Sequence, residues 1–239
     1  MPETKPISPL NNNLMISANE FSNSKDTFVY AMKHIKDIKH KLEIRQTINK
    51  FIYTCQQSIG ATLDALPAGE SSTARKINGD LFERYVRLIL MELGLSVRDG
   101  IVPVPVIVNG ETLFQMVYQH DLIIENGKTI KVIGSVKTSS KDRLDKIFID
   151  KFLYNRLTNS ETPHFAVFLH DVQRKGKEPN FGVNTTFLTG HFKGYTVKLN
   201  PLDGVYYCDL RPVMYSDSIL KEHIKTLDCL LIDDIWKFL

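Results

Sequence analysis

The sequence predicts an α/β fold in which helices flank a mixed central sheet. Apolar residues recur at helical spacing near the N-terminus and again over 142–157, which is the pattern of amphipathic helices. Between these segments, two apolar stretches surround a Glu-Asn-Gly-Lys turn at 125–128, which is typical of a β-hairpin. Helices, then strands around one crossover helix, then further strands and a helix form the order of an α/β core with added elements.

The N-terminal part is predicted to hold an arm and a helical extension. Residues 1–26 are rich in Pro, Asn and Ser, and we expect them to form a flexible arm. From Thr27 to Leu66 the pattern is helical, and apolar residues mark one face: Val29, Met32, Ile35, Ile38, Leu42, Ile48, Phe51 and Ile52. The opposite face is basic: Lys33, Lys36, Lys39, Lys41, Arg45 and Lys50. It is either an ordinary solvated face or a surface that follows a phosphate backbone.

A break and a second helical segment follow. Residues 67–78 include Pro, Gly and Ser and predict a connection, after which a helix is expected from Gly79 to Leu93. Phe82, Val86, Ile89 and Leu93 form its apolar stripe, and Gly94 ends it. Glu83 lies at the edge of that stripe, where a carboxylate usually only complements the helix dipole.

The middle of the chain is predicted to form most of the sheet. Residues 96–108 are expected to form an edge strand, because prolines at 103 and 105 lack the N–H that a central strand donates. Two central strands at 111–125 and 128–136 and a buried strand at 165–169 complete this part. The helix over 142–157 is expected to direct four apolar residues toward the sheet: Ile147, Phe148, Phe152 and Leu153.

The last part of the chain is predicted as a basic loop at 173–180, strands at 185–199 and 205–210, and a closing amphipathic helix at 216–239. That helix would bury Ile219, Ile224, Leu227 and Leu231, with Trp236 as a core anchor. We therefore expect one domain over 27–239. It would comprise a helical part at 27–66, a core at 79–172, and strands with a closing helix at 173–239.

Composition narrows the class of protein. The 239 residues carry a formal charge of only +3, so any affinity for nucleic acid must come from local clusters of Lys and Arg. Three widely spaced cysteines argue against a disulfide scaffold or a structural zinc site. The sequence has no apolar run of about 18 residues, no signal-peptide order and no Walker-type loop. We expect a soluble intracellular protein that does not use ATP.

The hairpin places two residues of chemical interest together. Asp121 opens its first strand and Lys137 ends its second, so both are expected at one edge of the sheet. Phosphodiester hydrolysis needs a positioned water and neutralisation of charge, which carboxylate-bound divalent metal ions supply. A lysine beside the water can orient it or lower its pKa. An Asp–Lys pair on a hairpin is also a common surface ion pair, and these two residues alone leave both interpretations open.

An aspartate, a short hairpin and a Val-Lys pair at a strand end resemble the PD-(D/E)XK nuclease core. Here His120-Asp121 stands in place of Pro-Asp, and Ser135-Val136-Lys137 in place of acidic-x-Lys. The serine is a poor metal ligand. The same exchange is found in the CCGG- and CCNGG-reading branch of type II restriction endonucleases, the EcoRII- and NgoMIV-like enzymes. In that branch the missing carboxylate lies on the next helix, about thirteen residues beyond the lysine; in this chain that position is Asp150.

The same branch carries a Lys-Thr-(Ser/Thr)-x-(Lys/Arg)-Asp-Arg motif, and residues 137–143 read Lys-Thr-Ser-Ser-Lys-Asp-Arg. The resemblance covers about thirty residues, with Glu83 as a weaker match. In the major groove, Arg143 and Lys141 could bind guanine O6 and N7, while Asp142 accepts from cytosine N4. The alternative is that Asp142 caps the following helix and the two basic residues are solvated.

The resemblance implies a Mg²⁺-dependent type II restriction endonuclease that cleaves double-stranded DNA at a short palindrome containing CC/GG. It implies catalytic roles for Asp121, Ser135, Lys137 and Asp150, with Asp121 and Asp150 as metal ligands and Glu83 assisting through a water. Residues Lys141, Asp142 and Arg143 would read the DNA.

A homodimer or higher oligomer, a cognate DNA methyltransferase and a prokaryotic cytoplasmic location belong to the same expectation. Glu83 and Asp145 remain alternatives for the second acidic ligand. Two other functions stay open: a structure- or damage-directed repair nuclease with the same core, and a non-catalytic DNA-binding module that keeps the fold.

Overall fold

A computed structural model describes residues 18–35, 37–38, 41–63, 66, 70–175 and 182–239. Its centre is a six-stranded sheet in the order β1-β2-β3-β4-β7-β8. The strands span Ser96–Val108, Glu111–Asn126, Thr129–Lys137, His164–Phe168, Gly204–Tyr207 and Ile224–Thr226. Strands β1, β2 and β3 pair antiparallel, whereas β3, β4, β7 and β8 run parallel. The mixed sheet agrees with the prediction, and β1 keeps the expected bounds at the edge of the sheet.

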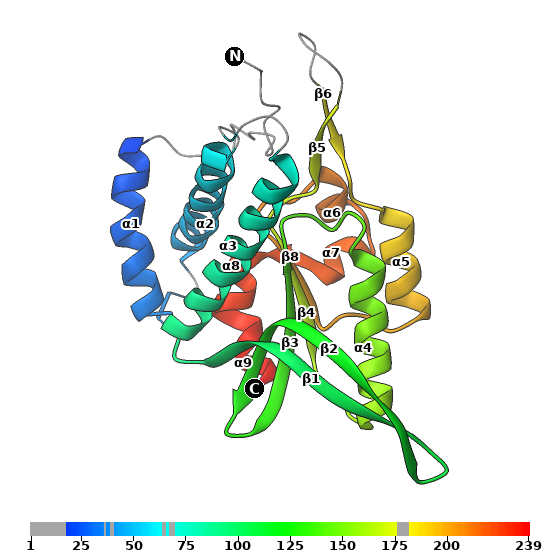
Figure 1. Ribbon diagram of the computed structural model, residues 1–239. Helices are drawn as coiled ribbons and strands as arrows, with labels where there is room; N and C mark the ends of the chain where they lie inside the picture. Colours follow the sequence, from blue (N-terminus) through cyan, green and yellow to red (C-terminus); the bar gives the residue numbers. More distant parts are fainter. Residues whose placement is uncertain (1–17, 36, 39–40, 64–65, 67–69, 176–181) are drawn as a thin grey trace.

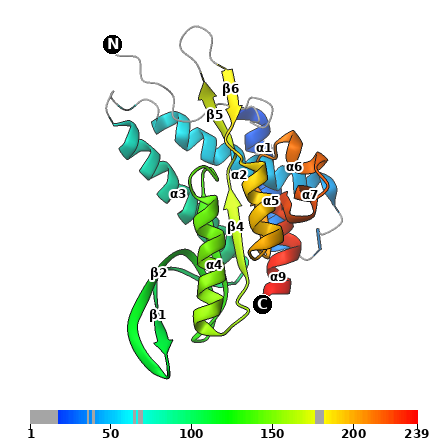
Figure 2. The ribbon, with the colours of Figure 1, turned by 90° about the vertical axis from the view of Figure 1, so that its right-hand side faces the viewer.

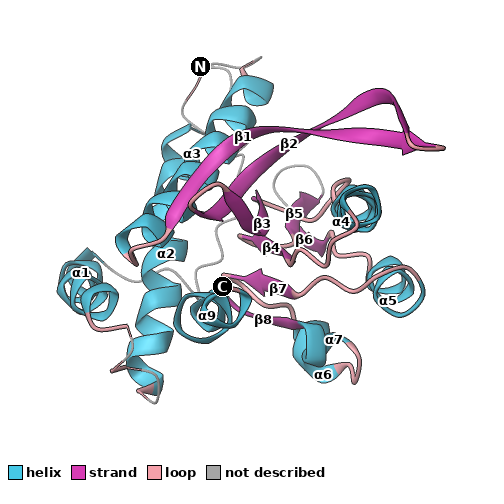
Figure 3. Ribbon diagram, turned by 90° about the horizontal axis from the view of Figure 1, so that it is seen from below, coloured by secondary structure: helices cyan, strands magenta, loops and turns pink. Residues whose placement is uncertain are grey.

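Helices cover both faces of the sheet. Helices α1 (Ala18–Lys33), α2 (Leu42–Leu63) and α3 (Ser71–Glu92) lie on one side with the C-terminal helical segment, and α4 (Leu144–Thr158) and α5 (Thr189–Lys198) lie on the other (Figures 1 and 3). Alternate residues of β4 serve the two layers: Phe165 and Val167 join the α1–α3 core, while Ala166 and Phe168 join the α4–α5 core. A period of two on a strand that is buried on both faces produces this division.

The N-terminal helices differ from the prediction in their bounds. Helix α1 begins at Ala18, so residues 18–26 are helical and the expectation of a flexible arm there is wrong; residues 1–17 lie outside the described residues. The helical pattern of 27–66 is divided between α1 and α2. Helix α3 begins at Ser71, well before Gly79, because Ala74 and Asn78 are buried and Gln56 of α2 donates to both the carbonyl and the side-chain oxygen of Asn78.

The predicted faces of these helices are mostly correct. Met32, Ile35, Ile38, Ile48, Phe51 and Ile52 are buried, but Val29 and Leu42 are exposed by 42% and 66%. The predicted basic face loses Arg45, which bonds Asp228 at 2.5 Å and Asp233 at 2.8 Å and so ties α2 to the C-terminal segment. Lys36 and Lys39 lie outside the described residues.

The second half of the chain differs more from the predicted secondary structure than the first half does. The predicted strand at 185–199 is mostly helix α5: its aromatic and β-branched residues suggest a strand, but Phe192 and Thr196 are buried at helical spacing. Part of the predicted loop at 173–180 is strand β5 (Val172–Lys175), which pairs with β6 (Gly182–Thr185), while 176–180 lie outside the described residues. This hairpin and the β1–β2 ribbon project from opposite ends of the sheet (Figure 2).

The closing helix is not continuous. The range predicted for it, 216–239, holds α7 (Leu220–His223), strand β8, and then α8 (Leu227–Cys229), a π-helical turn (Leu230–Asp234) and α9 (Ile235–Phe238), and a short helix α6 (Pro212–Ser216) precedes this range. The interruption arises because Ile224 pairs in parallel with Val205 and adds an edge to the sheet. Within the last segment, Trp236 is partly buried against the α1–α3 core and donates to the Leu231 carbonyl at 3.2 Å, as an anchor would.

The packing of helix α4, the state of the cysteines and the apolar length of the helices can also be compared with the predictions. In helix α4, Ile147 and Phe148 are buried, but Phe152 is 39% exposed and does not face the sheet as expected. The three cysteines are free thiols, in agreement with the argument against a disulfide scaffold. None of the helices in the described part of the chain has an apolar stretch long enough to span a bilayer.

Two buried histidines make stability depend on pH. Burial lowers the pKa of His164 from 6.5 to about 4, despite its bond to the Thr162 carbonyl, and it lowers the pKa of His170 to about 4. The unfolded chain therefore takes up these protons at a higher pH than the folded one. Their contribution to stability is present above pH 6.5 and is lost as the pH falls toward 4.

We expect the free energy of unfolding to fall by roughly 3 kcal/mol for His164 alone across that window. Urea denaturation at several pH values should show a smaller fall in His164→Phe, whose ring can still pack against Tyr154. An identical pH profile in the variant would contradict this account.

Candidate active site

The carboxyl ends of the parallel strands gather polar residues at one edge of the sheet. In register, Lys137 ends β3 beside Phe168 of β4, which lies beside Tyr207 of β7. In Figure 1 this edge lies at the upper end of the sheet, where the chain leaves β3 and crosses to α4. Open α/β sheets bind ligands at this edge, because side chains and backbone groups there are free of the strand ladder.

A β-bulge directs Asp121 to this edge. His120 pairs with Gly100 and Ile123 pairs with Arg98, so Asp121 and Leu122 together oppose the single residue Asp99. Side chains along a strand normally alternate between the two faces of the sheet. The extra residue shifts this alternation by one position, so even-numbered residues of β2 lie on one face before the bulge and on the other face after it. Tyr118 packs with Tyr154 of α4, whereas Leu122, an even number of positions along, joins the α1–α3 core. Bulges of this kind reorient a side chain beside a functional site.

Beside the bulge, a backbone N–H of β3 is not used in pairing with β2 and can bond the Asp121 carboxylate. The pairing of β2 with β3 ends at Leu122 and Gly134, and the Val136 N–H donates at 2.9 Å to Oδ2 of Asp121. The same oxygen accepts from Nζ of Lys137 at 2.6 Å. Asp121 and Lys137 are therefore together at the edge of the sheet, as the hairpin predicted.

Helix α3 adds a second carboxylate. Phe82 and Val86 are buried in the core, which places Glu83 at the boundary of the helix face that covers the sheet. Its Oε1 accepts from Nζ of Lys137 at 2.7 Å. One turn later Arg87 pairs with Asp99, the residue opposite the bulge. Two ionic contacts thus fix α3 over the bulge, and Lys137 lies between the carboxylates of Glu83 and Asp121.

Burial and charge set the ionisation of this cluster. Burial by itself would lower the pKa of the Lys137 ammonium, but the Asp121 and Glu83 carboxylates outweigh it and hold that pKa above its ordinary value. Burial, with the neighbouring Asp121 charge, raises the pKa of Glu83 even though Lys137 opposes the shift. Lys137 is therefore a cation at neutral pH, and it acts as a hydrogen-bond donor rather than as a base.

The donor set suits a hard divalent cation. Two carboxylates converge on one cationic group, and Mg²⁺ is usually held in proteins by one or two carboxylates, with waters completing its shell. Within the described residues, no three Asp, Glu, His or Cys side chains gather into a group able to bind a metal. The two carboxylates fit an ion that keeps most of its water.

Among the described residues, no hydrogen bond or ion pair joins the side chain of either of the other two predicted catalytic residues to this cluster. Ser135 is partly buried beside Ala166 of β4, and its hydroxyl makes no hydrogen bond to any residue that the structure describes. Asp150 forms an ion pair with Lys146 one turn back on α4. Its charge acts on His120 and Tyr118, on the α4 side of β2. The alternative carboxylate, Asp145, is exposed in the first turn of α4.

His120 is a core residue. Its ring stacks on Tyr118 at 5.7 Å and meets Tyr154 and His164 edge-on, and it is 5% exposed. The bulge therefore separates His120, whose ring lies in the core, from Asp121 at the edge of the sheet.

The segment of Lys141, Asp142 and Arg143 is exposed between β3 and α4. Asp142 has a φ of +56°, in the left-handed region, and Arg143 is the residue that precedes the first turn of α4. No side chain caps this helix end, so the alternative role of Asp142 as a helix cap is wrong. All three residues are placed where an approaching ligand could meet them, within a few residues of Lys137.

Asp171 is a further residue of this edge that the sequence pattern does not indicate, and it organises the chain between Lys137 and Lys141. Asp171 is fully buried and accepts from the hydroxyls of Ser139 and Ser140 at 2.9 and 2.7 Å. The available signal was its position, three residues beyond the buried strand that ends at Phe168 and therefore near the carboxyl edge of the sheet.

Comparison with known proteins agrees with this architecture. No protein-family model and no curated protein matches the chain. Among solved structures, the fold is similar to that of the type IIP restriction endonuclease Kpn2I, with a TM-score of 0.72 over 96% of this chain and 76% of that chain. The sequences are only 19% identical, so the similarity confirms the predicted restriction-endonuclease-like fold and goes no further.

The ionic cluster makes a direct prediction. In Lys137→Met, the pKa of Glu83 should rise further, because the ammonium is what opposes burial and the Asp121 charge. Carboxyl ¹³C chemical shifts measured against pH would report this. Lys146→Met is the matched control, since it removes a lysine that pairs only with Asp150 among the described carboxylates. An unchanged Glu83 titration in Lys137→Met would contradict the cluster.

Proposed function

We propose that this protein is a Mg²⁺-dependent type II restriction endonuclease. The observation that carries the proposal is the cluster of Asp121, Glu83 and Lys137 at the carboxyl edge of the sheet, four residues before an exposed Lys-Asp-Arg segment. The fold that holds the cluster is similar to that of a protein described as a type IIP restriction endonuclease.

Asp121, Glu83 and Lys137 would have different roles in phosphodiester hydrolysis. Asp121 and Glu83 would hold Mg²⁺, which supplies Lewis-acid stabilisation of the scissile phosphate and lowers the pKa of a bound water. Asp121 is fixed by the Val136 N–H, so its second oxygen can face the ion. Lys137 remains protonated, donates to a water or a phosphate oxygen, and offsets the negative charge that grows in the transition state.

The identity of the second acidic residue is part of the proposal. The family resemblance assigns it to Asp150, and the geometry favours Glu83, whose carboxylate already shares the Lys137 ammonium. Asp150 would first have to leave Lys146. Ser135 occupies the vacated acidic position and can contribute only a neutral hydroxyl to a water near the ion.

Recognition is assigned to the exposed segment. Arg143 and Lys141 would bind the O6 and N7 atoms of guanine, and Asp142 would accept from the N4 amine of cytosine. This combination reads adjacent C·G pairs, consistent with a palindrome of the CCGG or CCNGG type. A two-fold site calls for a homodimer or a higher oligomer, and a chain that cuts its own cell's DNA calls for a cognate methyltransferase in the same prokaryotic cytoplasm.

Two other functions make different predictions. A structure- or damage-directed repair nuclease would need the Asp121–Lys137 cluster but not Arg143. A non-catalytic DNA-binding module is favoured by the missing carboxylate at Ser135, and it would retain its activity when Asp121 is replaced. The intact ionic cluster supports an enzyme over the module.

Plasmid cleavage tests the enzyme. With Mg²⁺ the protein should cut a mixed-sequence plasmid into discrete fragments, and chelation by EDTA should stop the reaction. Lys137→Ala should slow cleavage at least about a hundredfold, the scale of a lost positioned donor or proton-transfer group. Glu83→Gln and Asp150→Asn, compared side by side, identify the second ligand as the one whose loss matches that of Asp121→Asn. DNA binding without cleavage under all divalent metals would contradict the enzyme.

A separate measurement tests recognition. Arg143→Ala should reduce discrimination against a substituted G·C pair by about tenfold to a hundredfold, because a bidentate guanine contact contributes roughly 1–3 kcal/mol. Competition binding with duplexes that differ at one base pair measures this ratio. Arg156→Ala, at the far end of the same helix, is the control. A uniform loss of affinity for every duplex would instead assign Arg143 to the phosphate backbone.

A further inference from the structure

We propose that Asp171 is a positioning residue that holds the segment joining Lys137 to the Lys-Asp-Arg triplet, so that base discrimination and cleavage depend on one buried carboxylate. The inference rests on the proposed function for its effect on DNA. Its structural part, that Asp171 fixes the conformation of residues 138–143, can be tested without any activity.

The Asp171 side chain collects donors from three separate parts of the chain. Oδ1 accepts from Ser139 Oγ at 2.9 Å, from the Ser140 N–H at 2.9 Å and from Thr186 Oγ1 at 3.0 Å. Oδ2 accepts from Ser140 Oγ at 2.7 Å and from the Tyr207 hydroxyl at 2.6 Å. The carboxylate thus joins the loop after β3, the end of the β5–β6 hairpin and strand β7.

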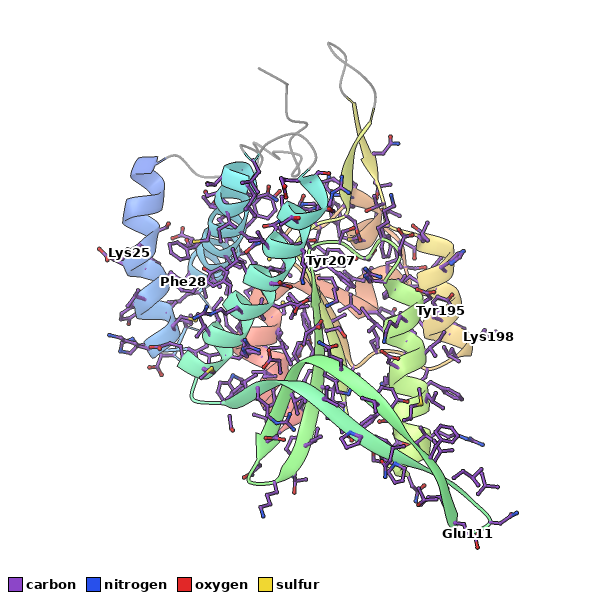
Figure 4. The ribbon with its side chains drawn as sticks, in the orientation of Figure 1. Lys25, Phe28, Glu111, Tyr195, Lys198 and Tyr207 are labelled. Carbon is purple, nitrogen blue, oxygen red and sulfur yellow. The ribbon has the colours of Figure 1, made fainter. Side chains whose placement is uncertain are left out.

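All five donors are neutral. Asp171 is 0% exposed, and within the described residues no Lys or Arg forms an ion pair with it. Burying a carboxylate is unfavourable unless hydrogen bonds replace its water, so the carboxylate and the segment that supplies three of its donors stabilise each other. Tyr207 belongs to the same arrangement, and Figure 4 shows it in the centre of the molecule between α3 and α4.

The restraint extends to the recognition triplet. Ser140, held by Asp171 through both its N–H and its hydroxyl, uses its carbonyl to accept from the N–H groups of Arg143 and Leu144 at 3.1 Å each. Between them Asp142 adopts a φ of +56°. Aspartate enters this region more readily than most residues, and here the two Ser140 bonds that span it hold it there. Asp171 therefore fixes the start of α4 and, two residues after Lys137, the exit of β3.

The chain contains a matched control. Tyr206, the neighbour of Tyr207 on β7, donates its hydroxyl to Asp234 at 3.0 Å, and Asp234 is likewise buried. That pair lies on the other face of the sheet, in the C-terminal segment, where Lys225 and Lys237 also bond Asp234. Asp234→Asn and Tyr206→Phe thus reproduce the loss of a buried Tyr–Asp bond away from the proposed DNA-binding segment.

The experiment compares Asp171→Asn and Tyr207→Phe with Asp234→Asn and Tyr206→Phe by two readouts. Hydrogen exchange reports the segment itself: amides over 138–144 should exchange at least about tenfold faster in Asp171→Asn, and less so in Tyr207→Phe, with no change in the two controls. Cleavage of a mixed-sequence plasmid reports function: Asp171→Asn should cut at additional sites and lose at least about tenfold in discrimination, while the controls keep the wild-type fragments.

The outcomes distinguish the positioning role of Asp171 from the proposed nuclease activity. Faster exchange over 138–144 in Asp171→Asn, combined with a wild type that cuts no DNA, would sustain the positioning role and remove the proposed nuclease. Unchanged exchange and an unchanged fragment pattern in Asp171→Asn would overturn the positioning role, as would equal effects from Asp234→Asn. If Asp171→Asn does not fold, Ser139→Ala and Ser140→Ala remove the donors in place of the acceptor and must produce the same local exchange and loss of discrimination.

Discussion

The ammonium of Lys137, shared by Asp121 and Glu83, is the contact on which the arrangement of this site depends. It joins a sheet hairpin to helix α3, and the two carboxylates that flank it come from segments that are far apart in the chain. Both carboxylates would repel each other without a cation between them. In the proposed function, the remaining oxygens of the two carboxylates would bind a divalent ion beside the lysine, which keeps its own contacts with Asp121 and Glu83.

The parallel half of the sheet determines what lies beside this cluster. Because β3, β4 and β7 end at one edge, residues at or just beyond their ends meet there: Lys137 at the end of β3, Asp171 shortly after β4 and Tyr207 at the end of β7. Asp171 then restrains the short segment that leads to the exposed triplet. In the proposed function, the catalytic cluster and the recognition segment would therefore be separated by only a few residues of restrained backbone, through which a change at the recognition surface could reach the reacting phosphate.

The sequence predicts the parts that depend on local pattern. The two prolines locate β1 at the sheet edge, and the Asn-Gly turn locates the β2–β3 hairpin. Lys137 ends β3 as predicted, whereas Asp121 lies inside β2, next to the last β2–β3 pair of Leu122 and Gly134. Local pattern misses the bulge, because no glycine or proline marks it within β2, and it misassigns α5, whose β-branched composition is overridden by burial of Phe192. The closing helix is interrupted because Ile224 adds a strand to the sheet, a long-range pairing that helical periodicity cannot reveal. Glu83 was found as a weak candidate, but its contact with Lys137 depends on how α3 packs.

The most direct test of the central claim, that Asp121 and Glu83 form a divalent-metal centre around Lys137, is affinity cleavage of the protein by bound iron. Fe²⁺ in place of Mg²⁺, with ascorbate and peroxide, generates radicals that cut the backbone near the metal. The account predicts cuts close to residues 83, 121 and 136, suppressed by excess Mg²⁺ and absent in Asp121→Asn. Cuts centred on α4 near Asp150 without any near Glu83 would contradict it, as would the absence of cuts that Mg²⁺ can suppress.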